Sequence, residues 1–128
     1  MTEARQQLGR TAEGLVAAQL PRRGMRIVAR NVRCSGVRGE IDLIALDGAT
    51  LVFVEVKALR ATAVAGPERP VLAVGYRKQR KLRSLALAWL AEHDGSVPRH
   101  AAVRFDVVGL RLDAAGRPVE WEHVVAAF

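Results

Sequence analysis

Two carboxylates and a lysine stand in a spacing that suits metal-assisted chemistry. Asp42, Glu55 and Lys57 form the pattern D-x12-E-x-K. Two neighbouring carboxylates can share one divalent cation, and a lysine beside them can orient or activate a water molecule. The three residues therefore indicate metal-dependent hydrolysis, provided that the fold brings their side chains together.

The surrounding segment predicts two β-strands joined by a tight turn. Residues 41–46 and 50–56 are rich in Val, Ile, Leu and Phe. Between them lies Asp47-Gly48, a dipeptide that is typical of two-residue hairpin loops. We therefore expect a β-hairpin over residues 41–56.

The register of this hairpin decides whether the three side chains can meet. With Asp47-Gly48 as a two-residue loop, Asp42 faces Phe53 and shares a face with Glu55 and Lys57. Glu55 is then the diagonal neighbour of Asp42, with Cα atoms roughly 7–8 Å apart. A four-residue loop places the two acids directly opposite each other, and a three-residue loop puts them on different faces. A shared cation requires the two carboxylates to lie within about 6 Å of each other.

Charged side chains are unexpected on these strands, which are otherwise apolar on both faces and so typical of a buried sheet. Charges there cost several kcal/mol unless they are paired or bind a metal. A structural ion pair between Lys57 and Glu55 or Asp42 explains the same residues. The residues alone leave the metal site and the ion pair both open.

The composition favours one compact domain over residues 1–128, because half of the residues are hydrophobic. The net charge of +7 and the pI of about 11.0 favour a polyanionic partner, although an arginine-rich genome produces the same balance. The single cysteine, Cys34, excludes an internal disulfide and a cysteine-rich zinc site. No signal peptide and no apolar run of about 20 residues is present, so we expect a cytoplasmic protein without a membrane partner.

Around the hairpin, the sequence predicts two helices and three further strands. A helix over residues 3–20 carries Glu13 at the edge of its apolar stripe, and Gly9 one turn earlier would allow close packing on a sheet. Residues 58–74 lack periodicity and predict a long loop that could close over a substrate. The other elements are a strand with an arginine-lined face, an amphipathic helix and a second hairpin, over residues 25–33, 76–93, 102–112 and 119–125.

Three acidic residues outside the pattern have more than one interpretation. Glu13 is either a solvated residue at the edge of its helix or a residue of the site. Glu40 is an alternative metal ligand, or a solvated or arginine-paired residue at the entrance of its strand. Asp106 alternates with apolar neighbours and is expected either to pair with Arg104 or to reach the site.

Basic residues gather in the first half of the helix over residues 76–93, with no acid among them. Such a run is often only a solvated face, but a helix N-terminus with cations also suits a phosphate. Lys78 and Gln79 extend the apolar stripe of this helix, so we expect one or both to point inward. The candidate DNA contacts are Arg38, Arg77, Lys78, Arg80 and Lys81.

The pattern around Asp42 resembles the active-site signature of the PD-(D/E)XK nucleases, the restriction-endonuclease-like superfamily, although Ile41 stands where that signature has proline. Further similarity extends along nearly the whole chain. The segments that carry it are Gly9-x-x-x-Glu13, 39–44, 52–57, Lys78-Gln79 and 104–108. Together they resemble the YraN family, small bacterial proteins that are similar to archaeal Holliday-junction resolvases.

The resemblance implies a fold, a reaction and a set of roles. The fold is α/β and restriction-endonuclease-like, with a central mixed sheet of about five strands flanked by helices in the order αβββαββ. The reaction is hydrolysis of DNA phosphodiester bonds, in duplex or branched DNA, and resolvase-like enzymes suggest a homodimer by analogy. Asp42, Glu55 and Glu13 would hold Mg²⁺ or Mn²⁺, Lys57 would be the catalytic lysine, and Gln79 an auxiliary residue.

Two other classes of function stay open, because a fold does not impose an activity. The first is a non-catalytic nucleic-acid-binding module whose acidic cluster is only structural. The second is an accessory protein that binds a partner through the long loop and the sheet. Affinity for Mg²⁺ or Mn²⁺ that depends on Asp42 and Glu55 is expected only of the nuclease.

Overall fold

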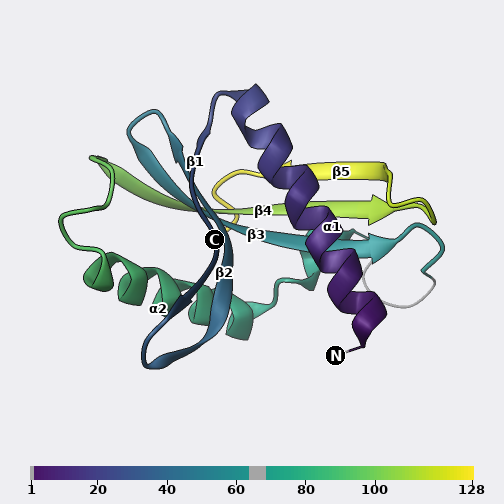
Figure 1. The fold of residues 1–128 in the computed structure, drawn as a ribbon, viewed down its shortest axis with the longest axis horizontal. Helices are drawn as coiled ribbons and strands as arrows, with labels where there is room; N and C mark the ends of the chain where they lie inside the picture. Colours follow the sequence, from purple (N-terminus) through teal and green to yellow (C-terminus); the bar gives the residue numbers. More distant parts are fainter. Residues whose placement is uncertain (1, 64–68) are drawn as a thin grey trace.

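The chain folds around one five-stranded sheet with a long helix on either side (Figure 1). The computed structural model describes residues 2–63 and 69–128. Its elements in chain order are α1 (Glu3–Gln19), the 3₁₀ turn η1 (Leu20–Arg23), β1 (Arg26–Cys34), β2 (Val37–Asp47), β3 (Thr50–Arg60), the 3₁₀ turn η2 (Pro70–Ala73), α2 (Tyr76–Glu92), β4 (Ala102–Leu112) and β5 (Pro118–Val124).

The sheet has the strand order β1-β2-β3-β4-β5, and only the β3–β4 pair is parallel. A parallel pair needs a crossover connection, and α2 lies in that connection. The result is an α/β protein with a mixed sheet and the order αβββαββ. This confirms the predicted fold class and is consistent with a restriction-endonuclease-like fold.

The two helices cover opposite faces of the sheet. Ala12, Val16 and Leu20 pack on one face with alternate residues of the central strands, among them Leu43 and Val54. The other face packs against α2 through a second apolar cluster that includes Ile44, Phe53, Leu85 and Trp89. Because the central strands are apolar on both faces, they are buried from both sides.

The β2–β3 turn differs from the predicted one. Asp47 pairs with Thr50 and Ile44 pairs with Phe53, so the turn centres on Gly48-Ala49. Gly48 has a φ of 59°, whereas Ala49 is not in the left-handed region. A hairpin turn with glycine at its first central position needs only one positive φ, whereas a turn centred on Asp47-Gly48 would need two. The predicted Asp42–Phe53 pairing is therefore wrong, and the register instead corresponds to the four-residue alternative.

Several element boundaries also differ from the predicted ones. β2 begins at Val37 and β3 continues to Arg60, so both strands are longer than expected. Part of the predicted 58–74 loop is thus strand, and η2 occupies another part. The centre of that loop, residues 64–68, lies outside the described residues, so its expected closure over a substrate stays untested.

The segment just before α2 closely approaches the sheet. At Gly109 of β4, a Cβ atom would lie 2.9 Å from Pro70 Cβ and 2.9 Å from the Val71 backbone nitrogen. The absence of a side chain therefore lets η2 pack directly on the sheet, just before α2 begins. Gly109 is also the register partner of Lys57.

Asp106 has a structural role in the sheet. It is fully buried and accepts hydrogen bonds from Arg104 Nε at 2.8 Å and from the Ala126 backbone N–H at 3.0 Å. His123 Nε2 lies 2.8 Å from its other carboxylate oxygen. The predicted pairing with Arg104 is confirmed, and these contacts lower the pKa of Asp106 despite its burial. In the described ranges, no helix is long and apolar enough to cross a membrane.

Candidate active site

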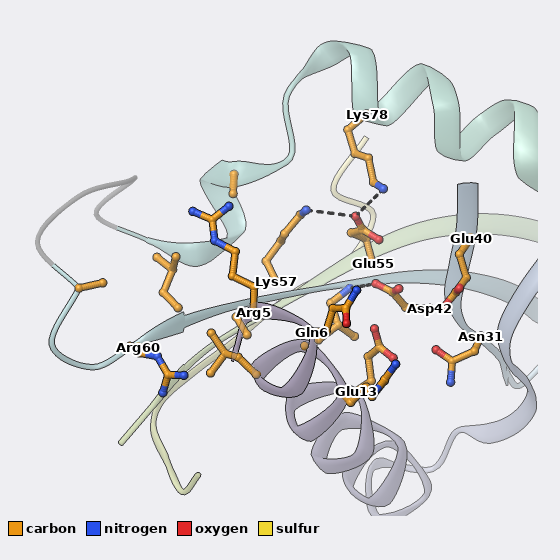
Figure 2. Close-up of a pocket in the computed structure, with 18 of the residues that line it drawn as sticks. Arg5, Gln6, Glu13, Asn31, Glu40, Asp42, Glu55, Lys57, Arg60 and Lys78 are labelled. Atoms are coloured by element: carbon orange, nitrogen blue, oxygen red, sulfur yellow. Dashed lines mark hydrogen bonds and ion pairs between the residues drawn. The ribbon is translucent and has the colours of Figure 1, made fainter. Parts of the chain in front are cut away.

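A groove of about 1170 Å³ lies between the first half of α1 and the second half of β3. Residues of β1, β2 and the start of α2 complete its lining, and Figure 2 shows their side chains converging on it. The polar lining residues are Arg5, Gln6, Arg10, Glu13, Asn31, Arg33, Glu40, Asp42, Glu55, Lys57, Arg60, Thr62 and Lys78. Among the described residues, the groove therefore gathers four acids and several cations from segments that are far apart in the sequence.

Asp42 and Glu55 meet at the centre of this groove. The β2–β3 register runs to Leu43↔Val54, and its continuation places Asp42 opposite Glu55. The two carboxyl groups are hydrogen-bonded to each other, and Asp42 Oδ2 accepts the backbone N–H of Val56 at 2.8 Å. Burial above all, and then the charge of Glu55, raises the pKa of Asp42 to about 9. Without a cation, the pair therefore holds a proton at neutral pH.

An irregular stretch of β2 lets Asp42 contact residues from both layers. Ile41 and Ile44 both pack on the α2 side, whereas Leu43 packs on the α1 side. Strict alternation would put Ile41 and Leu43 on one face, so the strand is irregular near Asp42. Glu13 can therefore reach Asp42 from α1, although Glu55 belongs to the face that α2 covers.

Glu13 and Glu40 complete a carboxylate cluster around Asp42. Single carboxylate oxygens of these three residues all lie within 4.8 Å of one another, and Glu13 is hydrogen-bonded to Asp42. Burial raises the pKa of Glu13, and the charges of Glu40 and Glu55 add to this effect. Glu13 thus lies in the site, as the resemblance implies. Glu40 was expected either as an alternative ligand or as a solvated or arginine-paired residue; it lies in the cluster and is also paired with an arginine, Arg33.

Asn31 of β1 lies between two of these acids and was missed by the sequence analysis. Its side-chain amide approaches Glu13 Oε1 at 2.7 Å and Glu40 Oε1 at 2.9 Å when the amide nitrogen is assigned to that side. Glu40 is also paired with Arg33, with 3.1 Å between Arg33 Nη2 and Glu40 Oε2. Asn31 has a φ of 50°, a conformation that asparagine tolerates better than most residues. The signal that could have pointed to Asn31 was the presence of an asparagine inside a predicted strand.

Two lysines share one oxygen of Glu55. Lys57 Nζ lies 3.5 Å and Lys78 Nζ lies 3.4 Å from Glu55 Oε2 (Figure 2). The Glu55 side chain is only 3% exposed, whereas the two lysines are 30% and 38% exposed. The ion pair between Lys57 and Glu55, predicted as the structural alternative, is therefore present together with the carboxylate cluster. Of the pair Lys78 and Gln79, Lys78 is the one that reaches the groove.

The remaining predicted site residues lie outside the groove lining. Gln79 donates from Nε2 to the Val74 carbonyl at 3.2 Å and lines a separate cavity. Arg38 and Arg77 are exposed, and the Arg80 guanidinium lies 5.8 Å from the centre of the Tyr76 ring. Lys81 packs near Gly39.

The cations that do line the groove come mostly from other elements. Arg5 and Arg10 belong to α1, Arg33 to β1 and Arg60 to the end of β3. Arg5, Arg10 and Arg60 were not predicted as site residues: the positions of Arg5 and Arg10 depend on how α1 crosses the sheet, and Arg60 falls in the stretch that was predicted as a loop. The predicted close packing at Gly9 is also wrong, since a Cβ there would meet no atom within 4 Å and the residue lines the groove.

The donor set fits a divalent cation with oxygen ligands. Such ions bind carboxylate oxygens at about 2.0–2.6 Å, so one ion can contact oxygens separated by up to about 5 Å. The ion pairs of the described residues reach Glu40 and Glu55 but leave Asp42 without a cation. The residues that would hold an ion are Glu13, Glu40 and Asp42, with Glu55 hydrogen-bonded to the last of them.

The fold and the site together define a restriction-endonuclease-like α/β protein with a carboxylate–lysine cluster in a basic groove. The profile of the uncharacterised protein family UPF0102 matches residues 12–110 of the chain. The chain belongs to this family, which is the YraN family of the sequence resemblance.

Relatives from several bacteria match over most of the chain. A UPF0102 protein of Streptomyces griseus is 46% identical over 120 residues, which cover 94% of this chain and 94% of the relative. A UPF0102 protein of Nocardia farcinica is 45% identical over 97% of this chain and 91% of its own length. One from Anaeromyxobacter dehalogenans is 44% identical over 98% and 87%. These names state a family and no activity.

Proposed function

We propose that this protein is a metal-dependent endonuclease that hydrolyses phosphodiester bonds of DNA. The observation that supports the proposal best is the convergence of Asp42, Glu55 and Lys57 in one groove. Six cations line the same groove, which suits a polyanion: Arg5, Arg10, Arg33, Lys57, Arg60 and Lys78.

Each residue of the cluster has a chemical task in this proposal. Glu13, Glu40, Asp42 and Glu55 would hold Mg²⁺ or Mn²⁺, the hard cations that carboxylates favour. When bound, the ion makes hydroxide available near neutral pH and neutralises charge on the phosphate. Lys57 lies at the edge of the carboxylates, partly exposed to the groove, where its ammonium group can orient the attacking water. The arginines of the groove would bind the flanking phosphates.

A cleavage assay with Mn²⁺ on linear, flapped and four-way-junction DNA tests this proposal. The three substrates separate a general nuclease from one that acts on branched DNA, as resemblance to the resolvases suggests. We expect Asp42→Asn and Lys57→Ala to lower the cleavage rate by about 10²-fold or more. Lys57→Ala should keep its DNA affinity within a few-fold, and Asp42→Asn should bind DNA as tightly as the parent or more tightly, because repulsion between carboxylate and phosphate is reduced.

Two controls make the result interpretable. Each variant must retain cooperative melting, because removing a charge from a buried cluster can unfold the site. Arg99→Met changes an exposed cation in the loop before β4 and should cut like the parent. If a folded Asp42→Asn or Lys57→Ala protein cuts at the parental rate, a contaminating nuclease carries the activity.

A non-catalytic DNA-binding module is the second candidate. The observation that favours it is that Lys57 and Lys78 already neutralise Glu55 without any metal. Calorimetric titration with Mn²⁺ distinguishes the candidates, since only the nuclease requires binding that is lost in Asp42→Asn and Glu55→Gln. Sedimentation with and without junction DNA would show whether the active species is a homodimer.

A further inference from the structure

Lys78 occupies a position that the pattern D-x12-E-x-K does not describe. It belongs to α2, whereas Glu55 and Lys57 belong to β3. Its Nζ atom is nevertheless as near to Glu55 Oε2 as that of Lys57, at 3.4 Å against 3.5 Å. Figure 2 shows the two ammonium groups approaching the carboxylate from different elements. A nearly buried carboxylate oxygen is therefore contacted by two cations.

Local helix energetics do not account for a lysine at this position. Lys78 lies in the first turn of α2, where the helix dipole disfavours positive charge. That turn contains no acidic residue, and the N-cap residue Gly75 provides no side-chain hydrogen bond. The carboxylate of Glu55 compensates the charge instead, and η2, which packs closely on Gly109, lies directly before the helix. The tertiary structure therefore places the ammonium group of Lys78 beside Glu55.

The neighbouring cations of α2 do not share this placement. Arg77 and Arg80 are exposed, and Arg80 stacks over Tyr76. Within the described part of the chain, Lys78 is the one residue of α2 that lines the groove. Its side chain is 38% exposed, so the ammonium group can contact both Glu55 and a ligand in the groove.

We infer that Lys78 is a second active-site lysine, which binds the phosphate of the substrate strand while Lys57 serves the attacking water. This inference rests on the proposed nuclease function. A divalent cation near Glu55 competes with both ammonium groups for the negative charge of that carboxylate. The phosphate of the bound strand then supplies the anion that one lysine needs. Lys78 suits this role because it approaches from the opposite side of the groove to α1 and its arginines.

The test compares Lys78→Met and Lys78→Arg with the surface control Arg99→Met. The first readout is Mn²⁺ affinity by calorimetry without DNA, which needs no enzymatic activity. We expect Lys78→Met to bind Mn²⁺ several-fold more tightly, because one repelling charge near Glu55 is gone. The second readout is steady-state cleavage, where kcat should fall about tenfold or more. Lys78→Arg should recover part of kcat, and Arg99→Met should match the parent in both readouts.

The possible outcomes separate this inference from the proposed function. Parental Mn²⁺ affinity and parental kcat in a folded Lys78→Met protein would overturn the role of Lys78. A parent that binds Mn²⁺ but cuts no DNA would refute the nuclease, and the Mn²⁺ titration of Lys78→Met would still decide whether Lys78 belongs to the metal site. A parent that binds no Mn²⁺ would refute both. Lower melting temperatures of Lys78→Met and Lys78→Arg with weaker Mn²⁺ binding would identify a merely structural ion pair.

Discussion

Asp42 is the residue at which burial and charge conflict most strongly. Its carboxyl group is hydrogen-bonded to Glu55 and Glu13, and none of the ion pairs in the described residues neutralises it. Its pKa rises from 3.8 to about 9, first because the group is buried and then because Glu55 is close. A protein that only needed stability would gain from an uncharged residue here. The cluster therefore fits the metal site proposed above.

The pH dependence of stability should report this proton. A raised folded-state pKa contributes stability that is fully present below the unfolded value of about 4 and is lost as pH rises through about 9. In a chelator, the melting temperature of the parent should therefore fall between pH 5 and pH 9. Asp42→Asn should flatten this decline, because its amide can donate to Glu55 or Glu13 without carrying a charge. Differential scanning calorimetry over this range measures both slopes.

The matched control for this measurement is Asp94→Asn. Asp94 is exposed in the turn after α2 and does not line the groove, so its replacement should keep the parental slope. Added Mn²⁺ should raise the parental melting temperature more at high pH, because the ion competes with the proton for Asp42. Equal pH slopes for the parent and Asp42→Asn in chelator would contradict a protonated Asp42.

Helix α1 forms one wall of the groove, and its glycines have different surroundings. Gly9 and Gly14 both have room for a Cβ atom, with no atom within 4 Å, but only Gly9 lines the groove. A glycine inside a helix costs about 0.5–1 kcal/mol of stability relative to a good helix former. Stability therefore does not explain why this wall of the groove contains a glycine, whereas passage of the proposed DNA substrate would.

Replacing each glycine by glutamine separates stability from access. Gly9→Gln and Gly14→Gln should each raise the free energy of unfolding by about 0.5–1 kcal/mol, as measured by urea denaturation. Gly9→Gln should also weaken DNA binding several-fold, because its side chain enters the groove. Gly14→Gln should bind like the parent. Equal DNA affinities for the two stabilised variants would mean that DNA does not pass Gly9.

The distribution of charge over the whole molecule suggests where DNA lies. Arg5 and Arg10 line the groove from α1, whereas Arg77 and Arg80 lie on the exposed side of α2. Both sets are proposed DNA contacts, but of the two only Arg5 and Arg10 line the groove that contains the carboxylates. Binding that places a phosphate at the cluster must use the groove cations, whereas non-specific attraction can use either set.

Salt dependence of binding distinguishes the two surfaces. Each neutralised phosphate contributes about 0.9 to the slope of log affinity against log salt concentration. The double variant Arg5→Gln, Arg10→Gln should therefore lower that slope by up to about 1.8 in a fluorescence anisotropy titration. The double variant Arg77→Gln, Arg80→Gln measures the share of α2 in the same experiment. Parental slopes in both double variants, or affinity that does not change with salt, would mean that the positive net charge reflects composition and has no role in DNA binding.

Much of the fold could be predicted from local patterns. Apolar periodicity placed α2 within one residue of Tyr76–Glu92, and the residues of β4 were predicted without error. Hydrophobic pattern and helix propensity act over a few residues, so the sequence by itself determines them. The approach of Asp42 to Glu55 was also predictable, since the two-residue and four-residue loops both place the two acids near each other, whereas a three-residue loop would not.

Tertiary structure decided the composition of the site. The addition of Asn31 to the cluster, and the choice among the alternatives for Glu40, depend on how β1 and β2 pair, with register shifts in β1 on both sides of Asn31. The choice of Lys78 over Gln79 depends on the position of α2, which the close contact at Gly109 helps to set. These outcomes follow from packing between segments that are distant in the chain. Successive side chains of a helix point about 100° apart, so a small change in how the helix is rotated decides which of two neighbouring residues points inward. Local patterns carry no information about such packing.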